Sequence, residues 1–130
     1  MNCYCSSGKE FADCCQPFIE GTAKPQTAEE LMRSRFSAYA ICAVEYLLRS
    51  THPSVRKSYT AEEIENWAKS NRWEKLEIVS KSDGETKDKF GTVEFKAYFL
   101  DENKAPQIHH EISTFRKELG KWFFVDGKVL

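Results

Sequence analysis

Four cysteines within the first fifteen residues constrain this chain more than any other feature. They are Cys3, Cys5, Cys14 and Cys15, in the spacing C-x-C-x8-C-C. Structural zinc prefers a tetrahedron of soft ligands, and four thiolates are among its commonest ligand sets. The stretch Ser6-Ser7-Gly8 favours a turn that brings the two pairs onto one ion, because glycine tolerates positive φ. The spacing therefore predicts a zinc site on these four cysteines.

Two other uses of clustered cysteines are open. One is a disulfide, but the chain begins at Met1 without the basic and apolar segment of a secretory signal. A reducing cytoplasm, where we expect the protein to reside, keeps thiols free. The other use is a pair of redox-active thiols, although such clusters more often bind metal. The fifth cysteine, Cys42, lies in an apolar helical stretch, and we expect it to be a small core residue.

Length and composition predict one compact domain with a small appendage. The chain has 130 residues, of which 41% are hydrophobic and 13% aromatic, enough to bury a sizeable core. Its 19 basic and 20 acidic residues give a net charge of −1, so no broad basic field is available for nucleic acid. No apolar run approaches the roughly twenty residues that a membrane span needs. We therefore expect a soluble protein, with nucleic acid an unlikely partner and membranes excluded.

A long helical segment is predicted from Thr27, which can form a capping box with Glu30. The apolar positions that follow recur mostly at spacings of three and four. They are Met32, Phe36, Tyr39, Ala40, Ala43 and Leu47. We expect a break near Cys42 and an end before Pro53, because the residue before a proline disfavours helix.

A second capping box, Thr60 with Glu63, begins a short helix on which Trp67 is expected to cover the core. After this helix the apolar period changes to two, the period of a strand. Four strands are predicted, at residues 73–80, 90–100, 107–116 and 121–129. Helices followed by an antiparallel meander indicate the α+β class.

The segment from Cys3 to Cys15 resembles the SEC-C motif, a zinc knuckle found at the end of the SecA translocation ATPase and in many small bacterial proteins. The usual form of the motif is C-x-C-G-S-G-K-x-[YF]-x-x-C-[CH]. Besides the first two cysteines, this chain matches it at Ser7, Gly8, Lys9, Phe11, Cys14 and Cys15. Ser6 departs from it, since the family usually has glycine there. The resemblance implies the same four zinc ligands.

Further along, the chain is similar to the YchJ-like family of uncharacterised bacterial proteins. The similar segments are 31–39, 46–47, 52–53, 110–113, 115 and 122–127. The resemblance implies a zinc knuckle, here residues 1–21, followed by a domain like nuclear transport factor 2 (NTF2), here residues 22–130. In that domain a curved antiparallel sheet is wrapped by N-terminal helices. The family has no established activity that the resemblance could imply.

The last two strands predict a cavity. A turn at Leu119-Gly120 would pair Phe115 with Phe124, Ser113 with Asp126 and Glu111 with Lys128. The polar and aromatic side chains that this register gathers on one face are Glu111, Ser113, Trp122 and Asp126. Such a face could line a cavity closed by the first long helix. His109 and His110 have opposite strand parity, so at most one of them faces this cavity.

Arg33 and Arg35 are the remaining candidates for this cavity, because they flank the apolar stripe of the helix. We expect at least one of them to be buried and to form an ion pair with Glu111 or Asp126, since a desolvated guanidinium needs a partner. The alternative is acid–base chemistry by the two carboxylates. Pockets of NTF2-like domains often host such chemistry, although a likeness of fold is weak support for it.

Two functional classes are consistent with the sequence. In the first, which we favour, the protein is an adaptor whose zinc knuckle binds a protein partner and exposes Lys9 and Phe11. The second is a small-molecule-binding protein or an enzyme that uses the cavity. The sequence lacks a phosphate loop and a nucleophile elbow, which disfavours an enzyme. Packing of Phe11 against Leu31 and Met32 would instead make the knuckle a structural clasp.

Overall fold

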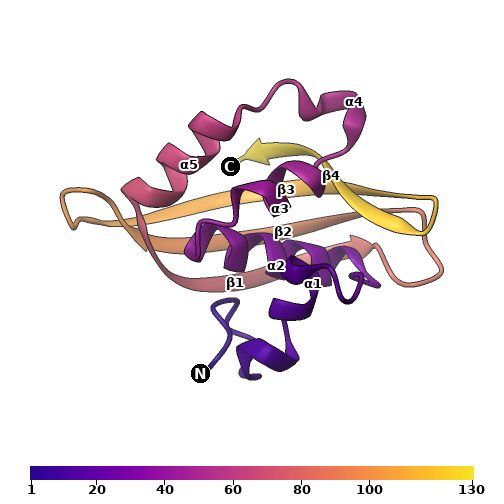
Figure 1. Cartoon of the computed structure of the whole chain (residues 1–130), viewed down its shortest axis with the longest axis horizontal. Coiled ribbons are helices and arrows are strands. Elements are labelled where there is room, and N and C mark those ends of the chain that lie inside the picture. Colours follow the sequence, from indigo (N-terminus) through magenta and orange to yellow (C-terminus); the bar gives the residue numbers. More distant parts are fainter.

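The computed structural model describes residues 1–130 and contains a four-stranded antiparallel sheet with helices on one face (Figure 1). The helical elements are η1 (Phe11–Asp13, a 3-10 turn), α1 (Gln16–Glu20), α2 (Ala28–Ala40), α3 (Val44–Arg49), α4 (Pro53–Arg56) and α5 (Ala61–Ser70). The strands are β1 (Arg72–Asp83), β2 (Phe90–Leu100), β3 (Pro106–Glu118) and β4 (Lys121–Val129), and they lie in that order in the sheet. The predicted α+β class and the antiparallel meander are confirmed.

Helix α2 is the central helix of the fold and packs against β1, β2 and β4. It begins as predicted, with the Thr27 hydroxyl accepting a hydrogen bond from the Glu30 amide at 3.1 Å. Its buried residues surround most of its circumference: Ala28, Leu31, Met32, Ser34, Arg35, Phe36, Ser37 and Ala38. The predicted break is present at Cys42, where φ is +59°. Because Cys42 forms this turn and is only half-buried, its expected place in the core is wrong.

The segment from Ser50 to His52 runs beside β4 and protects its outer edge. The His52 amide donates to the Phe124 carbonyl and the Phe124 amide donates to the Ser50 carbonyl, both at 2.8 Å. The helical segment ends before Pro53 as predicted, but Pro53 itself begins the short helix α4. Proline suits the first position of a helix, where its missing N–H leaves no bond unmade.

The sheet curves because two of its strands carry extra residues. The pairing of β1 with β2 skips Glu74 and Val79, and the pairing of β3 with β4 skips Val125. Such bulges bend a strand and increase its twist. On β2 the predicted alternation is confirmed, with the side chains of Val93, Phe95, Ala97 and Phe99 buried under the helices.

The bulge at Val125 changes the predicted register of the last hairpin. The turn lies at Leu119-Gly120, and Phe115 pairs with Phe124, both as predicted. Beyond the bulge, Thr114 pairs with Asp126, Ser113 with Gly127 and Glu111 with Val129. The predicted pairs of Ser113 with Asp126 and of Glu111 with Lys128 are therefore wrong. Asp126 shares the outer face with Thr114 and is exposed, while Gly127 takes its place beside Ser113.

The knuckle packs on the main body through one continuous core. Cys3, Cys5 and Cys15 belong to the same cluster of buried side chains as Leu31 and Met32 of α2.

No helix of the structure has the length and apolar character needed to cross a membrane.

Candidate functional site

The four knuckle cysteines converge on one point. Cys3 and Cys5 lie on the N-terminal loop, while Cys14 and Cys15 lie between η1 and α1. The four Sγ atoms are all within 4.8 Å of one another, with 3.7 Å between Cys5 and Cys14 and 3.9 Å between Cys14 and Cys15. Four sulfurs bound to zinc at about 2.3 Å would lie roughly 3.8 Å apart. All five cysteines are free, and the cluster has the dimensions of a tetrahedral metal site.

The turn between the two cysteine pairs has left-handed backbone at two positions, one of which is not glycine. Ser6 has φ +66° and Gly8 has φ +85°, both in the left-handed region. At Ser6 the side chain adds a contact that glycine could not make, because its hydroxyl accepts a hydrogen bond from the Leu76 amide of β1 at 3.1 Å. The Ser7 hydroxyl lies 3.2 Å from the Cys14 sulfur.

Helix α2 supports the cluster from the other side. Arg33 donates to the Cys5 carbonyl at 2.8 Å and pairs with Glu29 at 2.9 Å, while the Ser37 hydroxyl lies 3.5 Å from the Cys3 sulfur. The expectation that Arg33 contacts Glu111 or Asp126 is therefore wrong. The positive charge beside the cluster is suited to four thiolates around one divalent ion, which carry a net charge of −2.

The thiols share protons unequally. A hydrogen bond from the Cys15 thiol lowers the pKa of Cys5 to about 4, and the same bond raises the pKa of Cys15. Burial raises the pKa of Cys14. A metal ion bound to the four sulfurs would displace the protons that remain on the thiols. The residues present fit a four-cysteine metal site.

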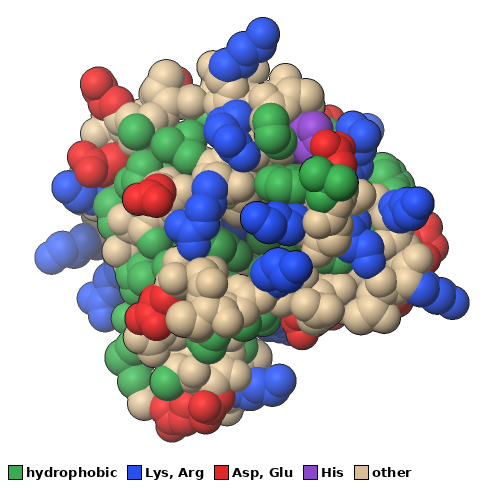
Figure 2. Space-filling view, turned by 45° about the vertical axis from the view of Figure 1, so that its right-hand side comes forward, with side chains coloured by type: hydrophobic (Ala, Val, Ile, Leu, Met, Phe, Trp, Pro, Cys, Tyr) green, Lys and Arg blue, Asp and Glu red, His purple; other side chains and the backbone are tan.

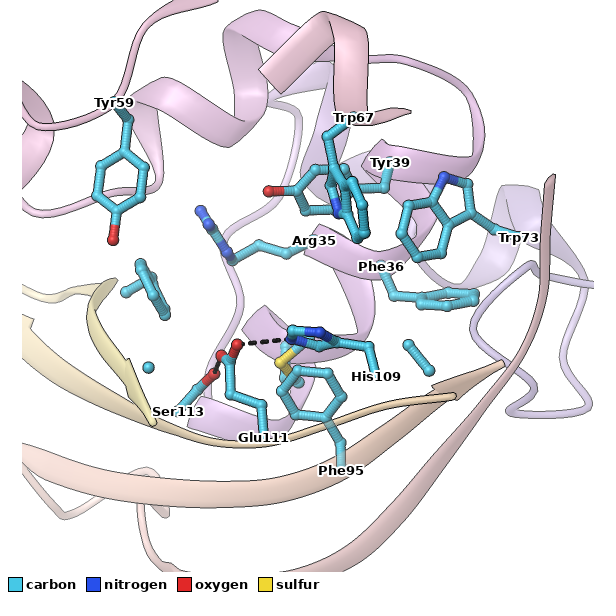
Figure 3. A pocket seen from close by; sticks show the side chains of 14 residues that line it. Arg35, Phe36, Tyr39, Tyr59, Trp67, Trp73, Phe95, His109, Glu111 and Ser113 are labelled. Carbon is cyan, nitrogen blue, oxygen red and sulfur yellow. Dashed lines mark hydrogen bonds and ion pairs between the residues drawn. The ribbon is translucent and has the colours of Figure 1, made fainter. Parts of the chain in front are cut away.

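A separate cavity of about 240 Å³ lies between the helices and the sheet (Figure 3). Apolar and aromatic side chains form most of its wall: Met32, Phe36, Tyr39, Tyr59, Trp67, Trp73, Phe95, Ala97 and Phe124. Trp67 covers the cavity as predicted for the core, packing edge-on against Trp73 and Phe99 while 44% of its surface stays exposed. The remaining lining residues are Arg35, His109, Glu111, Ser113 and Gly127.

Glu111 is the acidic centre of this cavity. Its carboxylate lies 2.8 Å from His109 Nε2 and accepts a hydrogen bond from the Ser113 hydroxyl at 2.5 Å (Figure 3). Burial raises the pKa of Glu111, but the bonds from His109 and Ser113 outweigh burial and lower it overall. Gly127 leaves room for this carboxylate, because a Cβ there would come within 2.7 Å of the Glu111 Cδ. As parity predicted, His110 points to the other face, where it meets Glu94 at 2.7 Å.

Arg35 is buried, as expected for one of the two arginines, but it forms no ion pair. Only 7% of its surface is exposed. Its Nη1 donates to the Leu47 carbonyl at 2.9 Å and to the Ser50 hydroxyl at 2.7 Å, and its guanidinium lies over the Phe124 ring at 4.6 Å. The expected contact with Glu111 or Asp126 is therefore wrong. Glu111 contributes only a longer-range attraction.

The other two nitrogens of Arg35 are free for a ligand. Nε and Nη2 donate to no protein atom, since every hydrogen bond of the side chain is made by Nη1. No fully buried polar side-chain atom of the protein lacks a partner, so these two groups are open to the cavity. In Figure 3 the guanidinium projects among Tyr59, Tyr39 and Glu111.

The structure thus brings together only part of the predicted pocket. Glu111, Ser113 and Arg35 line the cavity, whereas Trp122 is buried elsewhere and donates to the Gln26 carbonyl at 3.1 Å. Reasoning from the sequence missed Tyr39, Tyr59, Trp73 and Gly127 as lining residues. Strand alternation, which places Phe95 inward, is the signal that could have identified lining residues on the strands. Tyr59 lies outside the regular elements, so no periodic pattern could have identified it.

Comparisons with known proteins agree with this architecture. Residues 27–127 match the family described as YchJ, middle NTF2-like domain. A UPF0225 protein of Geobacter sulfurreducens is 41% identical over 125 residues, which cover 96% of this chain and 77% of the relative. A UPF0225 protein of Actinobacillus succinogenes is 39% identical over 127 residues, covering 98% and 81%.

Two solved structures are similar over nearly the whole chain. The solution structure of a SEC-C motif containing protein from Rhodopseudomonas palustris has a TM-score of 0.92 and 37% identity, covering 100% of this chain and 99% of that one. The crystal structure of a SEC-C motif containing protein from Psychrobacter arcticus has a TM-score of 0.81 and 36% identity, covering 96% and 75%. The domain from Thr27 onward is thus NTF2-like, and the chain belongs to the YchJ-like family, UPF0225.

Proposed function

We propose that this protein binds a small molecule that presents an anionic oxygen to Arg35 and a flat apolar body to the aromatic wall of the cavity. The observation that carries this proposal is the buried guanidinium with two unpaired donors. A buried charge without a carboxylate partner is costly, so such a group is expected to be completed by a ligand. A cavity of about 240 Å³ suits a molecule the size of one substituted ring.

Binding is favoured over catalysis because the carboxylate of the cavity is a weak base. Its pKa is lowered, and both of its oxygens already accept hydrogen bonds. A general base works best with a pKa near the working pH. In this proposal Glu111 and His109 fix the polarity of the cavity wall and leave Arg35 to hold the ligand.

The proposal includes zinc as a structural ion on Cys3, Cys5, Cys14 and Cys15, in a protein of the cytoplasm. When bound, zinc would supply folding energy to the knuckle, as it does in other four-cysteine sites. A structural clasp gains support from Phe11, which is half-buried and packs against the core cluster that contains Leu31 and Met32. Lys9 is exposed, so a protein partner on the knuckle stays a prediction.

Benzoate tests the cavity, with benzylamine and benzyl alcohol as cationic and neutral controls. We expect benzoate to raise the melting temperature and to change the fluorescence of Trp67 and Trp73, which line the cavity. Ala97→Leu fills the cavity from β2 and should abolish both effects, while Ala40→Leu, outside it, should preserve them. Arg35→Met should weaken benzoate more than benzyl alcohol. Equal binding of all three probes, or benzoate binding that survives Ala97→Leu, would contradict the proposal.

A further inference from the structure

A second hollow, which we call the cationic groove, lies between the linker after α1, helices α3 and α4, and the start of β4. It has a volume of about 450 Å³ and shares no lining residue with the Arg35 cavity. Four cationic side chains line it: Lys24, Arg49, Arg56 and Lys121. Its apolar lining comes mainly from Phe18, Leu31, Tyr46, Trp122 and Phe123. Figure 2 shows Lys and Arg side chains gathered over the middle of this face.

The charge of the groove is not neutralised by the protein. No aspartate or glutamate lines it, and none of its four cations takes part in an ion pair. The chain as a whole has 20 acidic residues and a net charge of −1, so the excess of positive charge is confined to this groove and does not reflect the overall composition. Unpaired like charges in one groove repel one another, and an anionic partner relieves that repulsion.

Two of the cations are held in place by backbone carbonyls. Arg56 donates to the Thr51 carbonyl from Nε at 3.1 Å and from Nη2 at 2.9 Å. Arg49 donates from Nη2 to the Ile19 carbonyl at 2.6 Å, and its guanidinium stacks over Tyr46 at 4.8 Å. Neutral carbonyls orient a guanidinium without cancelling its charge. The remaining donors are therefore pre-organised, which reduces the entropy that binding costs.

We propose that the cationic groove binds an acidic peptide segment of a partner protein, with carboxylates on the four cations and one apolar side chain on the aromatic floor. Nucleic acid fits less well, because single strands need exposed rings for base stacking. Tyr46 and Trp122 are each only 4% exposed, and Phe18 and Phe123 are half-buried, which suffices for one apolar side chain but gives no row of exposed rings for successive bases. The cations are also confined to one groove instead of forming the broad track that a phosphate backbone follows.

The test is fluorescence anisotropy with a labelled ten-residue peptide of glutamates and aspartates around one central phenylalanine. The probes compared with it are the same peptide with glutamine and asparagine, a ten-nucleotide oligothymidine and inorganic phosphate. We expect the acidic peptide to bind, its amide counterpart to fail, and the affinity to fall with added salt because exposed charges are screened. Replacing the central phenylalanine by alanine should weaken binding.

A matched pair of variants locates the site. Lys24→Glu with Lys121→Glu reverses two exposed groove lysines whose side chains make no hydrogen bond or ion pair within the protein, so we expect the fold to be preserved. We expect binding to weaken about tenfold, from two lost attractions and two new repulsions. Lys87→Glu with Lys128→Glu makes the same change of net charge outside the groove and should leave binding almost unchanged.

Four outcomes would overturn the inference. They are no binding of the acidic peptide, equal weakening by the two variant pairs, tighter binding of oligothymidine than of the peptide, and displacement of the peptide by millimolar inorganic phosphate. The third would make the groove a nucleic-acid site, and the fourth would make it a site for a small anion. None of the four depends on benzoate, so the groove and the Arg35 cavity are tested separately.

Discussion

Ser6 ties the knuckle to the sheet through one side chain. It keeps a left-handed φ of +66° and accepts a hydrogen bond from the Leu76 amide. A left-handed residue other than glycine costs about 1 kcal/mol, and a hydrogen bond of this kind contributes about the same. Ser6→Gly removes both and should leave the free energy of unfolding nearly unchanged. Ser6→Ala keeps the strain and loses the bond, so it should lower that free energy by about 1 kcal/mol. Urea unfolding of both variants checks this, and equal losses would refute the balance.

Glu111 gives the protein an acid-sensitive contribution to stability. Because its folded-state pKa lies below the ordinary value, the ionised carboxylate stabilises the native state at neutral pH. That stabilisation is lost as the pH falls below the unfolded value of about 4.3 and through the lower folded value. We expect Glu111→Gln to flatten the fall of the melting temperature over this acidic range. Glu102→Gln, exposed on the β2–β3 loop, is the control and should keep the wild-type slope.

The partners of Glu111 determine how much stability its removal costs. If Glu111 neutralised a buried arginine, its removal would cost roughly 3–5 kcal/mol. Its actual partners are His109 and Ser113. Glu111→Ala should therefore lower the free energy of unfolding by only about 1–3 kcal/mol, the cost of leaving such partners unsatisfied. Urea unfolding at pH 7 measures it, and a loss above this range would restore the arginine as the main partner.

At the scale of elements, the knuckle and α2 depend on the metal to different degrees. We expect elemental analysis of protein purified without added metal to find one zinc per chain. Removing it should abolish hydrogen-exchange protection in residues 1–21, while residues from Thr27 onward stay protected because their sheet and helices contain no ligand. A disulfide between Cys14 and Cys15 with little metal, or a knuckle that stays protected after chelation, would count against a structural zinc.

Helices and strands could be predicted from the sequence where their signals are local. The candidate site could not be predicted where it depends on contacts between residues far apart in the sequence. Both capping boxes place their helices, as the bond from the Glu63 amide to Thr60 shows again at 3.1 Å. The bulge at Val125 has no local signature, yet it turns Asp126 out of the cavity. The partners of Arg35 are carbonyl and hydroxyl groups supplied by the end of α3, which charge pairing alone could not reveal.

At the scale of the whole molecule, two different surfaces are candidates for binding a partner protein: the zinc knuckle and the cationic groove. Lys9→Glu with Asp13→Lys exchanges two exposed knuckle charges and keeps the net charge of the chain. If the knuckle binds a protein partner, this variant should lose partners that the wild type retains in a lysate pull-down. A variant that retains every partner would leave the knuckle as a clasp alone.

The docking of Ser6 on β1 also bears on aggregation. A sheet edge with free amides is a template on which another chain can add a strand. The β4 edge is occupied by Ser50–His52, which leaves β1 as the open edge, with Val79 exposed at one of its bulges. The knuckle stands against that edge and occupies the Leu76 amide. If oxidation of the cysteines displaced the knuckle, the Leu76 amide on this edge would lose its partner, and we expect the protein to self-associate through β1 before the sheet unfolded.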